Sequence, residues 1–324
     1  MTDLEPSAAT MTTLRFHNYG EPADVLRLEQ APIPDPGSGR VRIRVHACGL
    51  NPADWALCRG LFAGDLPRGI GLEVSGPVDA VGAEVTDVGV GDHVLGTADY
   101  AGCASAGASD YAIMDHWTPV PAGLDLIQAA ALPMAVETAF RSLENLDVGA
   151  NQTILIHAAG TTVGFAAVQI ALIRGATVIA TAGETFADRL RGFGAKVTSY
   201  GNGMVDRVID IAGGAIDLVL DTAPASGVLP DLISIAGGDP RHVLTITDFE
   251  AASQLGARSS LGEDATLRHD VLGEFAQLAL ERRFTVPVAR SFGLEDWRAA
   301  LDVSQSGQAH GKLVILPGRA SSAG

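Results

Sequence analysis

Cysteine and basic residues are both scarce in this sequence. The three cysteines, Cys48, Cys58 and Cys103, show no C-x-x-C spacing and are too few for a disulfide framework, so a reduced, cytoplasmic setting is expected. With 22 basic against 38 acidic residues, the formal net charge is −16. Such a surface repels phosphate groups, so neither nucleic acid nor an anionic membrane is an expected partner.

Long apolar runs are also lacking. No stretch of about 18 consecutive apolar residues occurs, so no membrane span is expected. Residues 1–10 contain Asp3 and Glu5 and lack the basic start and apolar core of a signal peptide, so they are predicted to form a disordered lead. At 324 residues and 47% hydrophobic content, the chain is long enough for two domains with separate cores.

Residues 153–174 predict a strand, a tight turn and a helix. An apolar, β-branched run is followed by a turn of small residues and then by a helical run. This arrangement is typical of the first unit of a dinucleotide-binding fold, where pyrophosphate oxygens approach the N–H groups at the helix start. Gly160 and Gly164 leave room for that approach, although Thr161 and Thr162 stand where further glycine is usual.

Strand and helix signals continue to alternate beyond this unit. Such alternation predicts a doubly wound parallel sheet with helices on both faces. A flavodoxin-like domain with another ligand is the alternative. The expected strands are Thr177–Thr181, a short one around Val197, Ile216–Asp221 and His242–Thr247, and the expected helices are Glu184–Phe193, 268–283 and 294–305.

Residues 11–130 predict a different architecture. Short strands are separated by Gly and Pro, and Arg40–Ala47 alternates polar and apolar residues, which favours a partly open β-barrel. Pro32, Pro34 and Pro36 are expected in a stiff surface segment outside any strand. The loop Thr97–Ser109, rich in Gly, Ala and Ser, is expected to be either a lid or an exposed turn.

Several motifs, in order, resemble those of medium-chain dehydrogenases/reductases. The resemblance covers nearly the whole chain after the first ten residues. It implies an α/β protein with a GroES-like partly open β-barrel domain, residues 11–130 with 285–324, and a Rossmann domain, residues 131–284, with the active site between them. The motifs are VHACGLNPADW (45–55), GLEVSGPV (71–78), VGDHV (90–94), AALP (130–133), ETA (137–139), the glycine turn and GKLV (311–314).

Two positions separate this chain from the zinc-dependent branch of that family. Asn51 and Leu72 stand where those enzymes carry a Cys and a His, and neither side chain supplies a thiolate or an imidazole for zinc. The chain therefore resembles the zinc-independent quinone oxidoreductases. That resemblance implies a homodimer that transfers hydride from a nicotinamide cofactor to a quinone or an α,β-unsaturated carbonyl compound.

The same resemblance implies catalytic roles for Asn51, Asp54 and Tyr111, and acceptor contacts from Asn51, Trp55 and Thr138. Asn51, Asp54, Tyr111 and Trp55 each have a structural alternative. Asn51 is also a suitable turn residue before proline, Asp54 a suitable helix cap, and the two aromatic rings suitable core residues. Water is an alternative source of the proton.

NADPH is the expected cofactor, with NADH as the alternative. The second strand ends without an acid, which departs from the usual NAD pattern, but the hydroxyl and basic residues typical of NADPH-binding relatives are also missing after Gly183. Arg189 and Arg191 are candidate phosphate ligands or solvated helix charges. The implied cofactor-binding residues are Thr138, Ala159, Gly160, Thr161, Thr162, Val163, Gly164, Gly183, Tyr200, Thr222, Thr245, Ile246, Thr247 and Lys312.

Two other functions fit the same sequence. One is a specialised biosynthetic reductase that acts on an enoyl or polyketide-type substrate, which would have a narrow acceptor range. The other is a non-redox protein that has kept the fold, since the expected phosphate ligands are missing.

Overall fold

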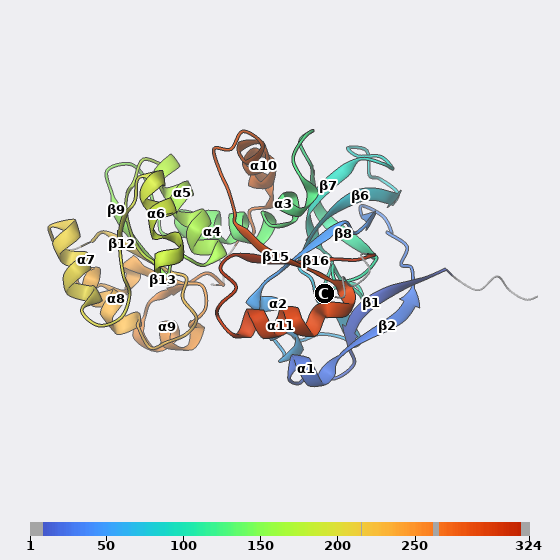
Figure 1. The fold of residues 1–324 in the computed structure, drawn as a ribbon, viewed down its shortest axis with the longest axis horizontal. Helices are drawn as coiled ribbons and strands as arrows, with labels where there is room; N and C mark the ends of the chain where they lie inside the picture. The colour runs from blue at the N-terminus through green and yellow to red at the C-terminus, as the bar shows by residue number, and fades with distance from the viewer. Residues whose placement is uncertain (1–8, 215, 262–265, 319–324) are drawn as a thin grey trace, which may run out of the picture. The chain divides into compact units, whose positions relative to one another are not determined.

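The computed structural model describes residues 9–214, 216–261 and 266–318 and divides the chain into two compact units (Figure 1). Unit 2, Ala135–Val271 with Phe284–Val286, is interrupted by a segment of unit 1. Most of the predicted disordered lead lies outside the described residues, and the first strand begins at Thr10. Unit 1 comprises Met1–Met134, Leu272–Arg283 and Pro287–Gly324.

The larger sheet of unit 1 closes partly on itself. Its strand order is β15-β16-β4-β6-β3-β8-β7, and β7 pairs with β6 as well as with β8. Four of the strands therefore form a ring, while the remaining three extend from it, as the predicted partly open barrel requires. The strands are β3 (Val41–Arg44), β4 (Ala47–Leu50), β6 (Glu73–Val81), β7 (His93–Ala98), β8 (Tyr111–Pro119), β15 (Val288–Gly293) and β16 (Lys312–Leu316).

A second sheet of unit 1 has the order β2-β1-β5, with β1 at Thr10–Phe16, β2 at Leu26–Pro32 and β5 at Arg68–Gly69. Pro32 is thus part of a strand, contrary to expectation. It is the last residue of an edge strand, where no N–H donor is needed. The helices of this unit are α1 (Pro22–Val25), α2 (Pro52–Cys58), α3 (Leu126–Ala130), α10 (Leu272–Leu280) and α11 (Trp297–Gln305).

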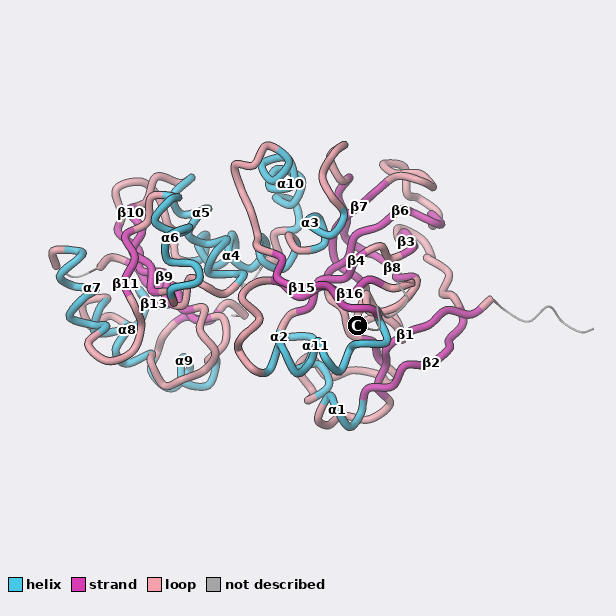
Figure 2. Tube along the Cα trace, viewed as in Figure 1, coloured by secondary structure: helices cyan, strands magenta, loops and turns pink. Residues whose placement is uncertain are grey.

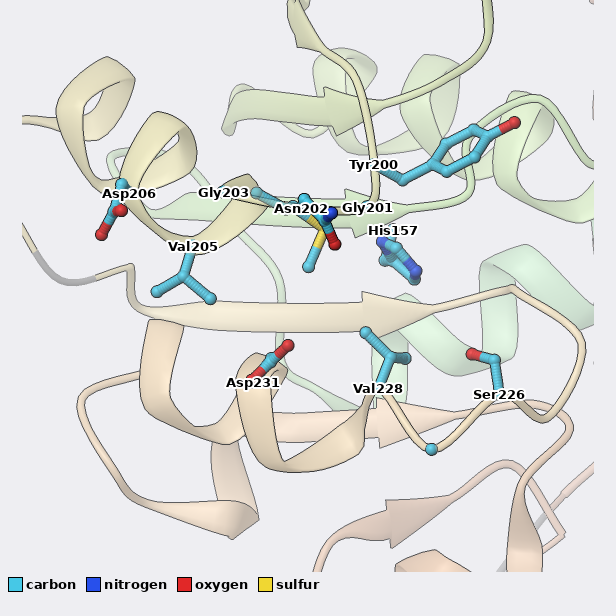
Figure 3. A pocket seen from close by; sticks show the side chains of 12 residues that line it. His157, Tyr200, Gly201, Asn202, Gly203, Val205, Asp206, Ser226, Val228 and Asp231 are labelled. Carbon is cyan, nitrogen blue, oxygen red and sulfur yellow. The ribbon is translucent and has the colours of Figure 1, made fainter.

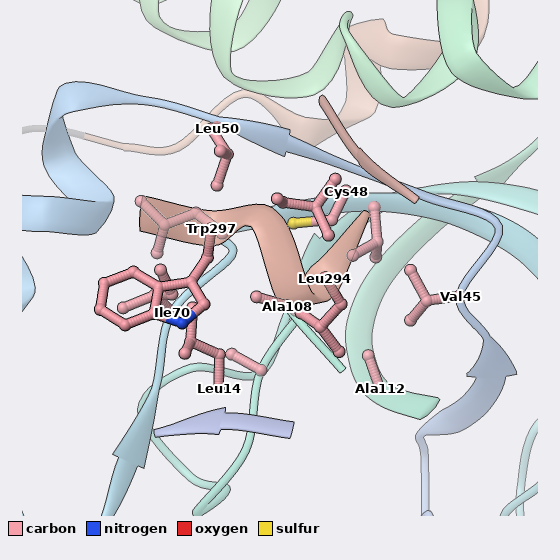
Figure 4. Close-up of a cluster of buried hydrophobic side chains, with 14 of the residues drawn as sticks. Leu14, Val45, Cys48, Leu50, Ile70, Ala108, Ala112, Leu294 and Trp297 are labelled. Atoms are coloured by element: carbon pink, nitrogen blue, oxygen red, sulfur yellow. The ribbon is translucent and has the colours of Figure 1, made fainter. Parts of the chain in front are cut away.

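The core of unit 1 lies between these sheets and α11. Buried side chains from β1, β4 and the Ala106–Ala112 segment pack against Leu294 and Trp297 (Figure 4). Cys48 and Cys58 are fully buried within it, as expected of small apolar residues. All three tryptophans of the chain belong to unit 1: Trp55, Trp117 and Trp297.

The loop after β7 matches the exposed-turn alternative only in its first part, where Ala101, Gly102 and Ala104 are exposed. Residues 105–109 are buried rather than exposed or free to move as a lid. The N–H groups of Gly107 and Ala108 donate to the carbonyls of Gly71 and Ile70, and the Ala108 carbonyl accepts from Leu14. Backbone pairing, rather than large side chains, therefore anchors this stretch, and composition gave no sign of it.

The sheet of unit 2 is parallel throughout and has the order β11-β10-β9-β12-β13-β14. Numbered along the chain, this is the order 3-2-1-4-5-6 of a doubly wound dinucleotide-binding fold. The predicted fold class is therefore confirmed. The strands are β9 (Thr153–His157), β10 (Thr177–Thr181), β11 (Lys196–Thr198), β12 (Leu218–Asp221), β13 (Val243–Thr245) and β14 (Arg258–Ser259).

Helices cover both faces of this sheet, with α5 and α6 on one face and α7, α8 and α9 on the other (Figure 2). The predicted bounds of α6 are confirmed. The helix ends before Gly194, because this residue adopts a positive φ of 113°. No described helix is long and apolar enough to cross a membrane. The helices are α4 (Pro133–Asn145), α5 (Thr162–Ile173), α6 (Glu184–Phe193), α7 (Met204–Ala212), α8 (Leu229–Ile235) and α9 (Phe249–Leu255).

Candidate active site

Three neighbouring strands of unit 1 bring Lys312, Asn51 and Glu73 together. Asn51 directly follows β4, while Glu73 and Lys312 begin β6 and β16, the strands on either side of β4. The Lys312 ammonium lies 2.5 Å from Glu73 Oε1 and 2.6 Å from Asn51 Oδ1. Asn51 Nδ2 donates to the same Glu73 oxygen at 2.9 Å. The three side chains are at most 7% exposed, so they form a buried polar cluster.

The chemistry of its partners fixes the orientation of the Asn51 amide. An ammonium can only donate, so it must face the amide oxygen, and an ionised carboxylate can only accept, so it must face the amide nitrogen. Glu73 uses one of the two N–H groups on Nδ2. The second N–H makes no hydrogen bond to another described residue.

Asp54 holds the start of α2 to the segment before β6. Its Oδ1 accepts hydrogen bonds from the N–H groups of Gly71, at 2.7 Å, and Leu72, at 3.0 Å, and its Oδ2 accepts from Asn51 N–H at 2.7 Å. Burial raises the pKa of Asp54 to about 6, against the effect of these donors. These contacts match the capping alternative, and a catalytic role for Asp54 stays a prediction.

The acceptor contact predicted for Trp55 and the catalytic role predicted for Tyr111 stay predictions, and both rings have other contacts. Trp55 is 2% exposed, packs in the core, and donates from Nε1 to Ser304 Oγ at 2.8 Å, which matches its packing alternative. Tyr111 begins β8, and β6 and β3 lie between β8 and β4 in the sheet. Its ring lies 5.7 Å from the Arg42 guanidinium carbon.

In unit 2, hydroxyl groups lock the turn between β9 and α5. Thr161 caps α5, because its Oγ1 accepts from Gly164 N–H at 3.0 Å. The same hydroxyl donates to Thr222 Oγ1, which donates to the His157 carbonyl. A Cβ atom on Gly164 would lie 2.6 Å from Thr222 Oγ1, so only glycine fits there. The threonine that replaces a usual glycine therefore holds the turn closed.

The start of α5 fits a dinucleotide pyrophosphate. The first N–H groups of a helix have no intrahelical acceptor, and those of Thr162 and Val163 lie at half-buried positions beside Gly160. Ala159 is fully buried, and its N–H donates to the Thr181 carbonyl, which ties the turn to β10. The donors present are neutral amides and hydroxyls, which suit an anion at a helix start.

The ends of β12 and β13 are joined through Asp221. Its carboxylate accepts from Ala223 N–H at 3.1 Å and from Thr245 Oγ1 at 3.0 Å, and its carbonyl accepts from Ile246 N–H. Burial raises the pKa of Asp221 to about 6. Thr247 Oγ1 donates to the Ala223 carbonyl at 2.5 Å. The segment expected to flank the nicotinamide is therefore held by side chains as well as by backbone.

A pocket of about 630 Å³ opens at the carboxyl edge of the unit 2 sheet (Figure 3). His157, at the end of β9, lies between the loop that carries Tyr200 and the loop that carries Ser226. Burial lowers the pKa of His157 to about 4, so the ring is neutral at pH 7. Its Nδ1 lies 2.8 Å from Thr181 Oγ1. In such folds the crevice beyond the strand ends is where dinucleotides bind.

Three of these residues were given no site role from the sequence: Glu73, His157 and Asp221. Glu73 begins its strand, whereas His157 and Asp221 end theirs, and a polar residue at a strand terminus was the available signal. Lys312 was expected to bind the cofactor. Its ammonium instead bonds Glu73 and Asn51, so binding phosphate would require it to leave a buried carboxylate. Its cofactor contact stays a prediction.

Thr138 and Gly183 are the remaining predicted residues, and both belong to unit 2. Thr138 is half-buried on α4, with its hydroxyl 3.4 Å from a carboxylate oxygen of Glu137. Gly183 is exposed and caps the start of α6. Within the described residues, no group of three or more His, Cys, Asp or Glu side chains is placed to hold a metal ion.

Comparison with known proteins covers most of the chain. Residues 37–125 match the alcohol dehydrogenase GroES-like domain, and residues 176–315 match a zinc-binding dehydrogenase domain. The quinone oxidoreductase of Rattus norvegicus is 28% identical over 333 residues, which span 94% of this chain and 98% of that protein. The solved quinone oxidoreductase from Coxiella burnetii has a TM-score of 0.81 at 27% identity, covering 95% of this chain and 99% of that one.

A further similarity is to part of a much larger protein. The phenolphthiocerol synthesis polyketide synthase Pks15/1 of Mycobacterium bovis is 34% identical over 236 residues, which span 70% of this chain. The match spans only 11% of that polyketide synthase.

Proposed function

Because this chain belongs to the medium-chain dehydrogenase/reductase superfamily and resembles its quinone oxidoreductases, we propose that it reduces a quinone or an α,β-unsaturated carbonyl compound. The coarser statement, that it is an oxidoreductase with a nicotinamide cofactor, follows from the family. The finer proposal concerns the acceptor and the residues that hold it.

The unpartnered N–H of Asn51 carries this proposal. Reduction of a quinone or an enone places negative charge on the carbonyl oxygen, and a fixed donor aimed at that oxygen lowers the barrier. Lys312 lies 2.6 Å from the amide oxygen of Asn51 and polarises the amide, which strengthens its N–H groups as donors. Asn51 would therefore bind the acceptor oxygen, with Lys312 and Glu73 as the residues that position it.

The nicotinamide dinucleotide supplies the hydride, and this chain's residues hold it in place. The N–H groups that begin α5 would bind the pyrophosphate, and Thr245–Thr247, fixed by Asp221, would flank the ring, as the resemblance implies. Thr138 is the further predicted contact. Solvent water is the proton source we favour, because three backbone donors already engage Asp54. Tyr111 is the alternative donor.

We also propose that no zinc ion takes part. The donor chemistry supports this, since Asn51 and Leu72 are poor zinc ligands. The Lys312 ammonium also already places a positive charge between Asn51 and Glu73. A divalent ion between Asn51 and Glu73 would be repelled by the Lys312 ammonium unless it displaced that ammonium.

A biosynthetic enoyl reduction is the second candidate, and the 34% identity to a segment of a polyketide synthase favours it. The two candidates differ in acceptor range. A quinone reductase should accept many quinones and simple enones, whereas a biosynthetic enzyme should accept one class of enoyl compound. A screen of purified protein against both sets, with dinucleotide oxidation as the readout, separates them. The non-redox alternative predicts no turnover and no dinucleotide binding.

Substitution of Asn51 tests the site itself. Asn51→Ala should lower kcat/KM for the acceptor by about 100-fold or more, the usual cost of losing one donor to a developing oxyanion. Dinucleotide affinity should stay unchanged. Asn18→Ala, at an exposed position, is the matched control. Acceptor reduction that survives Asn51→Ala and Thr138→Ala unchanged would show that the site assignment is wrong.

The predicted homodimer, the cytoplasmic location and the placement of the active site between the two domains remain proposals from the resemblance. Sedimentation equilibrium of the purified chain tests the first of them.

A further inference from the structure

We propose that this chain selects NADH over NADPH and that Glu184 is the residue that decides. The inference rests on the proposed function, because it presumes that a nicotinamide dinucleotide binds unit 2. It reverses the NADPH expectation drawn from the sequence. Four observations on unit 2 support it. They are the position of Glu184, the charges on its helix face, the contacts of the nearby arginines and the charges that line the adjacent pocket.

Glu184 lies where the adenosine ribose is expected. In a doubly wound fold, the ribose lies beyond the second strand, which here is β10. That strand ends at Thr181, Gly183 caps α6, and Glu184 is the first helical residue. A Cβ atom on Gly183 would meet only the Tyr200 hydroxyl, at 3.7 Å, so the space beside Gly183 is open. Tyr200 itself lines the 630 Å³ pocket.

The helix face that begins at Glu184 carries carboxylates in its first two turns and Arg191, paired with Asp188, after them. Ala187 and Asp188 follow at the spacings of three and four residues that share one face of a helix. Glu184 and Asp188 are both exposed, and Ala187 offers no charge. A carboxylate here can accept hydrogen bonds from the 2′ and 3′ hydroxyls of NADH. A 2′-phosphate carries about −1.5 to −2 charges at pH 7 and would be repelled.

The nearby arginines have other partners. The Arg189 guanidinium lies 4.9 Å from the centre of the Phe165 ring. Arg191 pairs with Asp188 at 2.8 Å, and this pair is exposed and therefore weak. Arg207 donates to the carbonyls of Ser199 and Asn202 and to Thr198 Oγ1. None of these contacts directs a guanidinium group toward the open space beside Gly183.

The adjacent pocket adds negative and no positive charge. Asp206 and Asp231 line it, and its described lining residues include neither lysine nor arginine. His157 is neutral at pH 7, because burial lowers its pKa to about 4. The pocket that Tyr200 lines next to Gly183 therefore supplies no lysine or arginine for the extra phosphate of NADPH.

Calorimetric titration of the purified full chain with NADH and with NADPH tests the inference without any acceptor. NADH should bind at least about tenfold more tightly, since opposing a phosphate with a carboxylate costs a factor of ten or more. Glu184→Gln should tighten NADPH binding severalfold while changing NADH binding little, because the amide keeps an acceptor oxygen. Glu184→Ser combined with Ala187→Lys should make NADPH the tighter ligand. Asp210→Asn, the same loss of charge at the far end of α7, is the matched control and should change neither affinity.

Three results would overturn the inference. Tighter NADPH binding by the unsubstituted chain would do so, and Arg189→Met and Arg191→Met would then identify the phosphate ligand. An NADPH affinity that does not respond to Glu184→Gln would remove Glu184 from the role. If neither dinucleotide binds, the proposed function fails together with this inference, whereas tighter NADPH binding leaves the proposed function intact.

Discussion

Lys312 and Glu73 are almost completely removed from water, with side chains 1% and 0% exposed. Removing one member of such a pair leaves the other as an uncompensated buried charge. We therefore expect Lys312→Met to lower the free energy of unfolding by about 3–5 kcal/mol. Urea denaturation followed by circular dichroism measures the loss.

The double variant Lys312→Met/Glu73→Gln is the control for that loss. It removes both charges and keeps a hydrogen-bonding group beside Asn51, so it should recover part of the stability. A double variant no more stable than Lys312→Met would indicate that lost packing, rather than the uncompensated carboxylate, causes the effect.

His157 should make stability depend on pH. Burial lowers its pKa from 6.5 to about 4, so between these values the unfolded chain binds a proton that the folded chain does not. Its contribution is therefore present above pH 6.5 and is lost as the pH falls toward 4, by about 3 kcal/mol in total. Asp54 and Asp221, with raised pKa values, act in the opposite direction over much of this range.

The difference between the parent chain and His157→Gln isolates the histidine, because the aspartates are common to both. The variant should gain stability relative to the parent as the pH is lowered from 7 to 4.5, measured by urea unfolding at each pH. A difference that is constant across this range would mean that His157 is not buried in its neutral form.

Individual residues also show how far the sequence could predict the site. Asn51 and Asp54 lie three residues apart in one motif, so their proximity was predictable from the chain. Lys312 is 261 residues from Asn51 in the sequence, and only the pairing of β16 with β4 brings them together. No local pattern encodes that pairing, so Lys312 was assigned to the cofactor and Glu73 was given no role.

At the level of elements, the contact between the β9–α5 turn and Thr222, the residue after β12, depends on Gly164. A Cβ atom there would lie 2.6 Å from Thr222 Oγ1 and 2.8 Å from the Ala158 carbonyl oxygen, so Gly164→Ala must displace α5. We expect a loss of about 1–3 kcal/mol in stability and a clear loss of NADH affinity, from urea unfolding and calorimetry.

Gly160→Ala is the matched control, because a Cβ atom at Gly160 would meet only a carbon of Phe186, at 3.3 Å. This variant should leave the free energy of unfolding nearly unchanged. If both variants bind NADH as the parent does, the turn does not hold the dinucleotide.

Elements with strong local signals were predicted well. The acid after Gly183 and the glycine at position 194 marked both ends of α6, and the β-branched runs marked β9 and β10. The buried stretch 105–109 was not predictable in this way. Its small residues predict a flexible segment. The backbone hydrogen bonds that anchor it are made with segments distant in the sequence.

At the scale of the whole molecule, the net charge of −16 implies mutual repulsion that salt should screen. We expect 0.3 M sodium chloride to raise the Tm by about 2 °C or more relative to low-salt buffer. Scanning calorimetry measures the shift, and choline chloride at the same ionic strength should reproduce it. A Tm that falls with both salts would show that attraction between surface charges outweighs repulsion.

The placement of all three tryptophans in unit 1 determines what optical spectroscopy can report. Trp55 and Trp297 are 2% and 5% exposed, so their emission should shift to longer wavelength when the core of unit 1 is opened to solvent. Unit 2 has no indole of its own, so its unfolding is invisible in this signal. A dinucleotide that binds unit 2 will therefore move a tryptophan-monitored melting curve only to the extent that the two units unfold together. Comparison of that curve with far-ultraviolet circular dichroism, which sees both units, measures the cooperativity between them.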